Sequence, residues 1–127
     1  MKILLDTNRL SDALAEDDAV LDRLETAEEI HVPVVALGEI RAGFLAGRRP
    51  AQNEARLGWF LSRDGVSTIG IDSRVSHRYA EIHRALRRAG KPIPTNDLWI
   101  AALAIEHGLA LYSRDAHFAD VPGLARL

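Results

Sequence analysis

The stretch KILLDTN, residues 2–8, decides the fold, because an apolar run meets a turn-forming run there. Lys2 to Leu5 is too short for a helix and predicts a strand. Asp, Thr and Asn side chains favour turns and helix starts, and they follow directly at residues 6–8. The sequence therefore predicts a strand that leads through Asp6 into a helix.

The same order of strand and helix continues along the chain. Apolar spacing predicts further strands at residues 30–32, 67–71 and 109–112, and a final short strand at 124–127. Helical spacing, caps and glycine stops predict helices at residues 8–15, 19–27, 34–46, 53–62, 73–89 and 97–107. Strands that alternate with helices form a mainly parallel sheet flanked by helices on both faces. We therefore expect an α/β fold in one domain, residues 1–127, because no repeat or linker divides the chain.

The composition is that of an ordinary globular protein, with 47% hydrophobic and 27% charged residues. No apolar run approaches the roughly 20 residues of a membrane span, and Asp6 interrupts the first run too early for a signal peptide. The absence of cysteine fits a reducing compartment and excludes thiolate chemistry. We therefore expect a cytoplasmic protein without membrane contact. The net charge of −2 does not indicate a nucleic-acid binder, although basic residues gather at 48–49 and 74–91.

Two acids follow predicted strands, where open parallel sheets bind their ligands. Asp6 comes directly after the first strand, and Asp115 comes after the fourth, behind Ser113 and Arg114. Each acid could instead be only the N-cap of the next helix. The two acids together favour a functional site at this edge of the sheet.

Two further acids lie on predicted helices. Glu39 falls on a small apolar stripe, so we expect it to be partly buried and to need a cation or a proton; the stripe consists of Val35, Ala36, Ala42, Gly43 and Ala46. Asp97 heads a similar stripe on its helix, although an acid there could also serve only the helix dipole.

If the four acids converge, their mutual repulsion requires a counterion. Their oxygen ligands, with no cysteine and no paired histidines, indicate Mg²⁺ or Mn²⁺ rather than zinc. Such ions promote phosphodiester hydrolysis. The chain has no dinucleotide or nucleotide-triphosphate motif, and Ser113 has no evident base for a hydrolase triad. The histidines are interpreted as structural or surface residues: His31, His77, His83, His107 and His117.

Four motifs together resemble a known family. They are LLDTN at residues 4–8, ALGEI at 36–40, NDLWIAALA at 96–104 and LYSRDAHFADVPGL at 111–124. In order and spacing the chain resembles the PIN-domain nucleases, and among them the VapC-type toxins of bacterial toxin–antitoxin pairs. The resemblance spans nearly the whole chain.

The resemblance implies an Mg²⁺- or Mn²⁺-dependent endoribonuclease that cleaves single-stranded or loop RNA such as tRNA. It implies a homodimer that is silenced by a VapB-like antitoxin, which inserts a segment over the active site. The residues that match the family's catalytic and metal-binding acids are Asp6, Glu39, Asp97 and Asp115. Asn8 and Ser113 match supporting positions, and the family often has Thr where this chain has Ser113. Asp120 is interpreted as a loop acid, with a role at the site left open.

Three alternatives remain. A haloacid-dehalogenase-type phosphatase needs a second Asp two residues after the first, where this chain has Asn8. A response-regulator-like domain usually has paired acids after its first strand and a lysine after its last, which are absent. A catalytically silent PIN-like module that binds RNA or a protein is the third, and the intact set of acids favours the enzyme over it. Trp59 and Phe60 could form an exposed dimer patch or belong to the core.

Overall fold

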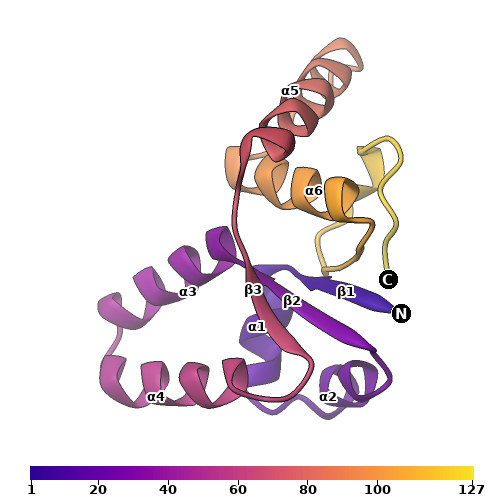
Figure 1. Ribbon diagram of the computed structural model, residues 1–127. Coiled ribbons are helices and arrows are strands. Elements are labelled where there is room, and N and C mark those ends of the chain that lie inside the picture. The colour runs from indigo at the N-terminus through magenta and orange to yellow at the C-terminus, as the bar shows by residue number, and fades with distance from the viewer.

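A short parallel sheet lies at the centre of the computed structural model, which describes residues 1–127 (Figure 1). Its four strands run in the order β3-β2-β1-β4, and every neighbouring pair is parallel. The strands are β1 (Lys2–Leu5), β2 (Glu29–Pro33), β3 (Val66–Ile69) and β4 (Ala110–Tyr112). The predicted α/β fold is therefore confirmed.

The helices form two groups on opposite faces of this sheet. Figure 1 shows α1 to α4 on one face and α5 and α6 on the other. Their bounds are α1 (Thr7–Leu14), α2 (Asp18–Glu25), α3 (Val34–Ala46), α4 (Pro50–Leu61), α5 (Ser73–Arg88) and α6 (Thr95–His107), followed by a 3₁₀ helix, η1 (Ala116–Asp120). None of these helices combines the length and the apolar character needed to cross a bilayer.

The residues of β1 explain why both faces of the sheet are covered. Successive side chains of a strand point to opposite faces. Ile3 and Leu5 belong to the core cluster formed with α1 to α4, whereas Leu4 belongs to the cluster formed with α5 and α6. All three side chains are completely buried. The strand is therefore apolar at consecutive positions, as expected for a parallel sheet buried on both sides.

Most boundaries differ from the prediction by one or two residues, and two differences are larger. α4 begins at Pro50 rather than at residue 53, because proline at the first helical position has a preset backbone angle and no N–H to satisfy. Residues 124–127 do not form a regular strand. They make one isolated parallel bridge, between Arg126 and Leu111, on the outer edge of β4.

The strand order creates the crevice where the site is found. β1 has β2 on one side and β4 on the other, and the chain leaves β1 toward β2 before returning much later to β4. Ligands of open parallel sheets bind at such a change of direction, beyond the carboxyl ends of the strands. Leu5 pairs with Tyr112 in register, so the residues after them emerge side by side.

Candidate active site

Asp6 lies at the centre of the site and is the one charged residue of the chain that is buried, with 2% of its surface exposed. Its backbone N–H donates to the carbonyl of Tyr112 at 3.0 Å, which joins the end of β1 to the end of β4. Its Oδ1 accepts a hydrogen bond from the Thr7 N–H at 2.8 Å and so caps α1. Asp6 therefore has both features considered from the sequence: it is an N-cap, and it lies in the crevice.

Asn8 and Ser113 hold the other oxygen of Asp6. The Ser113 hydroxyl donates to Asp6 Oδ2 at 2.6 Å, and the Asn8 amide donates to the same atom at 2.9 Å. Asn8 Nδ2 also lies 3.3 Å from Asp115 Oδ2, and Asn8 Oδ1 accepts from the Arg114 N–H at 3.1 Å. These bonds connect α1 with the loop after β4, although the residues are more than a hundred positions apart.

Glu39 reaches the site from α3, but it is exposed rather than partly buried. The buried side of α3 consists of Ala36, Leu37 and Ile40, so the helix is rotated relative to the small apolar stripe expected from the sequence. The Glu39 carboxylate accepts one hydrogen bond, from the Thr7 hydroxyl at 2.9 Å. Thr7 was not predicted as a site residue.

Asp97 and Asp115 complete the set of four acids. Asp97 lies in the first turn of α6, and 14% of its side chain is exposed. Asp115 precedes η1 and makes no side-chain cap, so its exposed carboxylate stays available. Asp120 forms an ion pair with Lys91, with 3.4 Å between Oδ1 and Nζ, which agrees with its interpretation as a loop acid.

His117 contacts this cluster, which the interpretation of the histidines as structural or surface residues missed. Its Nε2 lies 2.6 Å from Asp97 Oδ2. One ligand atom each from Asp97, Asp115 and His117 lies within 4.8 Å of the other two. The available sequence signal was the position of His117 two residues after Asp115.

The electrostatics of the cluster favour a bound cation. Burial raises the pKa of Asp6, and the charges of Asp115 and Glu39 raise it further, while the hydrogen bonds from Ser113 and Thr7 lower it. Burial also raises the pKa of Asp97, the charge of Asp6 adds to that effect, and His117 opposes it. Carboxylates that are close enough to raise one another's pKa, and therefore costly to ionise together, fit a divalent metal ion.

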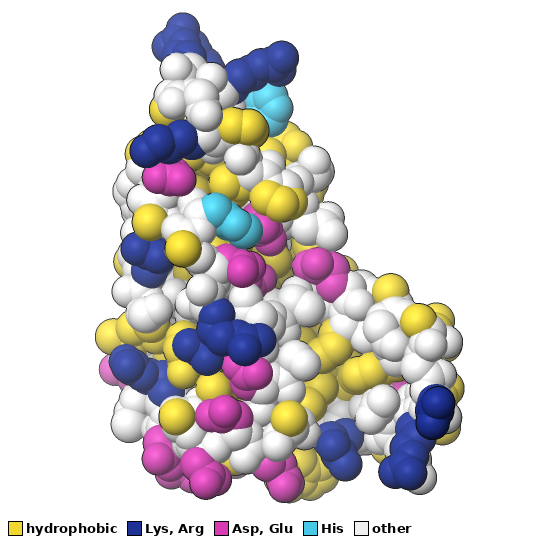
Figure 2. Space-filling view, turned by 180° about the vertical axis from the view of Figure 1, so that it is seen from behind, with side chains coloured by type: hydrophobic (Ala, Val, Ile, Leu, Met, Phe, Trp, Pro, Cys, Tyr) yellow, Lys and Arg dark blue, Asp and Glu magenta, His cyan; other side chains and the backbone are white.

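The surface around the cluster has both signs of charge. Figure 2 shows acidic side chains and a histidine gathered near the middle of one face, with lysine and arginine side chains above and below them. Phosphate groups are repelled by carboxylates, so a bound cation and flanking basic residues would both be needed to hold a nucleic acid here.

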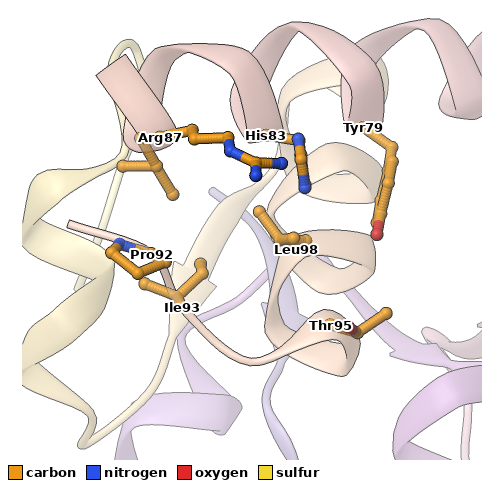
Figure 3. Close-up of a pocket in the computed structure, with 8 residues that line it drawn as sticks. Tyr79, His83, Arg87, Pro92, Ile93, Thr95 and Leu98 are labelled. Carbon is orange, nitrogen blue, oxygen red and sulfur yellow. The ribbon is translucent and has the colours of Figure 1, made fainter. Parts of the chain in front are cut away.

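A cavity of about 360 Å³ lies between α5 and the loop that leads into α6 (Figure 3). Tyr79, His83 and Arg87 line it from α5, and Pro92 and Ile93 line it from the loop; Tyr79 lies at the opposite end of the cavity from these two residues. The Tyr79 ring stacks on Trp99, with 4.0 Å between ring centres, and Tyr79 also stacks with His83. The cavity also includes Thr95, two residues before Asp97 at the start of α6.

Comparison with known proteins places these features in a family. The PIN domain model matches residues 3–124. Ribonuclease VapC4 of Mycobacterium tuberculosis is 38% identical over 91 residues, which cover 72% of this chain and 70% of that protein. The VapC ribonuclease Y4jK of Sinorhizobium fredii is 32% identical over 130 residues, which cover 96% and 93%.

Solved structures agree with the sequence comparison. VapBC2 from Rickettsia felis, bound to a DNA fragment of its promoter, matches with a TM-score of 0.91 and 26% identity over 100% of this chain and 98% of that chain. VapBC-5 from Mycobacterium tuberculosis matches with a TM-score of 0.73 and 28% identity, covering 98% and 94%.

Proposed function

This chain belongs to the PIN-domain family, and we propose that it hydrolyses RNA at a divalent-metal centre formed by its four clustered acids, Asp6, Glu39, Asp97 and Asp115. It is a ribonuclease of the VapC type, the toxin of a toxin–antitoxin pair. The observation that carries the metal proposal is the buried carboxylate of Asp6, which lies among other acids and has its pKa raised. We treat residues 1–127 as one nuclease domain.

The residues of the site have different roles in binding a metal ion. When bound, Mg²⁺ or Mn²⁺ polarises a phosphodiester, makes water a better nucleophile and stabilises the leaving oxygen. Asp6 and Asp97 are the less exposed ligands, whereas Glu39 and Asp115 lie at the solvent side. Asn8 and Ser113 orient Asp6 through hydrogen bonds; such bonds fix the direction of ligand oxygens.

The cavity beside α5 supports single-stranded or loop RNA as the substrate. An unpaired base can stack on aromatic side chains, whereas a paired base in a duplex is not free to do so. His83 and Tyr79, whose ring is already stacked on Trp99, offer such rings, and Arg87 offers a positive charge in the same cavity. We propose that a nucleotide next to the scissile bond binds there.

A protein partner is the second part of the proposal. The matched VapBC structures are complexes of a toxin with its antitoxin, and we propose that a VapB-like antitoxin covers this active site. We also propose a homodimer in the cytoplasm. Trp59 on α4 and Leu45 on α3 are 69% and 79% exposed and supply apolar surface, whereas Phe60 belongs to the core. Light scattering of the free chain tests the dimer, and co-purification with the product of a neighbouring gene tests the antitoxin.

Cleavage of RNA by the purified chain tests the enzyme directly. The protein is stripped of metal and incubated with total tRNA and with single-stranded RNA, with and without Mg²⁺ or Mn²⁺. We expect cleavage that requires the ion and is lost in Asp97→Asn. Asp120→Asn is the matched control, because Asp120 pairs with Lys91 outside the cluster. If the folded chain cuts no RNA with either ion, the silent binding module becomes the better description.

Binding of RNA to the cavity is tested separately from cleavage. With metal absent, Arg87→Ala should raise the Kd for single-stranded RNA by about tenfold. The substitution removes an ion pair between the guanidinium and an RNA phosphate, and it removes part of the surface on which a base can stack. Arg48→Ala removes the same charge from the turn between α3 and α4 and should change the Kd much less. Equal effects of the two substitutions would reject the cavity as a base-binding site.

A further inference from the structure

His117 is held at the acid cluster by its own short helix. It belongs to η1, and the next residue, Phe118, is completely buried and anchors that helix in the core. The two rings pack with 5.0 Å between their centres. The Nε2 atom is buried, makes no hydrogen bond of good geometry, and has the carboxylate of Asp97 as its close polar contact, at 2.6 Å. A buried nitrogen that contacts only an acid is suited to binding a cation.

We propose that His117 is a nitrogen ligand of the divalent ion and biases the centre toward Mn²⁺ over Mg²⁺. The inference rests on the proposed function, because it concerns the same metal centre. The basis is the position of the imidazole: a ring nitrogen of His117 lies within 4.8 Å of carboxylate oxygens of Asp97 and Asp115, and Nε2 itself lies 2.6 Å from Asp97 Oδ2. Ligands bonded at about 2.1 Å lie at most about 4.2 Å apart, so shifts of well under 1 Å bring these groups to one ion.

The chemistry of a nitrogen donor leads to the expected preference. Mg²⁺ is a hard ion that takes oxygen ligands and gives up its waters reluctantly. Imidazole favours first-row transition ions. A site with carboxylates and one imidazole therefore discriminates against Mg²⁺ more than a site with carboxylates alone. The ligand set expected from the sequence contains only oxygen donors and therefore does not predict this preference for Mn²⁺ over Mg²⁺.

A simpler role for His117 must be distinguished from ligation. The ring could only donate a hydrogen bond that orients Asp97 toward the ion, and such outer partners also strengthen metal binding. Orientation of Asp97 alone should strengthen Mg²⁺ and Mn²⁺ binding to a similar degree. Direct ligation should strengthen Mn²⁺ binding selectively and place a nitrogen nucleus against the unpaired electrons of Mn²⁺.

Electron spin echo spectroscopy of the Mn²⁺ complex tests the inference without any assay of activity. We expect modulation from one directly bound ¹⁴N in the wild-type chain and its loss in His117→Ala and His117→Gln. His77→Ala is the matched control, because His77 is exposed on α5, and it should retain the modulation. Wild-type protein with ¹⁵N-labelled histidine should show the corresponding ¹⁵N signal, which keeps the test valid if both His117 variants fail to fold.

Metal affinities give the second measurement. His117→Gln should raise the Kd of Mn²⁺ by about tenfold and that of Mg²⁺ by less than about threefold. A bound Mn²⁺ without a nitrogen signal, or equal losses for the two ions, would overturn ligation and leave the proposed nuclease centre intact. No binding of Mn²⁺ to the folded wild-type chain would overturn the centre as well.

Discussion

The two sides of the acid cluster are built in different ways. On the sheet side, Asp6 is buried and accepts hydrogen bonds from Thr7, Asn8 and Ser113. On the helix side, Glu39 is exposed and accepts one hydrogen bond, from the Thr7 hydroxyl. A buried and fully bonded carboxylate keeps its position before the ion arrives, whereas an exposed one must give up rotamer freedom to bind. The contrast indicates that the half of the site with Asp6 is fixed and sets the position of the metal ion. The half with Glu39 is adjustable and closes around the ion.

Loss of the fixed carboxylate should have the largest effect. Asp6→Asn removes a negative charge from the centre, and we expect RNA cleavage to fall by more than about 10²-fold, the range found when one charge-stabilising group is lost. The measurement is the initial rate at saturating metal. Asp17→Asn is a matched control, because Asp17 caps α2 as Asp6 caps α1, and asparagine caps helices equally well. An active Asp6→Asn enzyme would contradict the proposed centre.

Loss of a support on the fixed half should have the next largest effect. Ser113→Ala removes the 2.6 Å hydrogen bond to Asp6 and should raise the metal Kd by about 10- to 100-fold, as measured for outer partners of metal ligands. Ser113→Thr keeps the hydroxyl and should restore binding. Calorimetric titration with Mn²⁺ reports the Kd. If Ser113→Ala binds as tightly as the wild-type chain, Asp6 does not depend on this support.

Loss of the support on the adjustable half should cost less. Thr7→Val removes the hydroxyl that bonds Glu39, and we expect the cleavage rate to fall by about two- to tenfold, equal to one exposed hydrogen bond. Thr7→Ser should recover most of the rate. Steady-state kinetics measure the change. A loss as large as that of Ser113→Ala would show that both halves of the site are equally fixed.

The smallest expected effect concerns the stability of the metal-free chain. Burial and the charge of Asp6 raise the pKa of Asp97, so the folded state holds this proton more tightly than the unfolded chain, and stability is lost as pH rises through the raised pKa. Asp97→Asn removes that penalty and should raise Tm at pH 7 by a few degrees. The gain should shrink as pH falls through the ordinary Asp pKa of about 3.9, because the acid then becomes protonated in both states.

Thermal unfolding followed by circular dichroism at pH 3.5 and pH 7 measures this gain, with Asp120→Asn as the control at each pH. With saturating Mn²⁺ the wild-type chain should have the higher Tm of the two, because the bound ion stabilises the wild-type fold. A lower Tm for Asp97→Asn at pH 7 without metal would mean that the contact with His117 outweighs burial.

The sequence was sufficient to predict the order of elements and the acids at the strand ends. These features have local signals: an apolar run followed by Asp-Thr-Asn marks the end of β1, and proline and glycine mark helix ends. Asp6 and Asp115 could therefore be assigned to one edge of the sheet before their contacts were known.

The orientation of α3 and the contacts of Thr7 and His117 could not be predicted in the same way. α3 is apolar on most sides, so its sequence does not reveal which face is buried, and packing of Leu37 and Ile40 rotates Glu39 into solvent. The contact of His117 with Asp97 depends on how η1 packs through Phe118, which is a tertiary feature. Side-chain partners across a crevice follow from packing and have no local sequence pattern.

The inner position of β1 also affects when the enzyme becomes active during its own synthesis. β1 is made before the other three strands, and its neighbour β4 begins more than a hundred residues later. At bacterial elongation rates this delay is roughly 5–20 seconds. Ser113, Asp115 and His117 follow β4 in the chain, so a chain that ends before β4 has neither the complete sheet nor the complete set of proposed ligands. A nascent chain that has not yet reached β4 therefore lacks part of the proposed centre, and the ribosome that makes it is not exposed to an active nuclease at that stage.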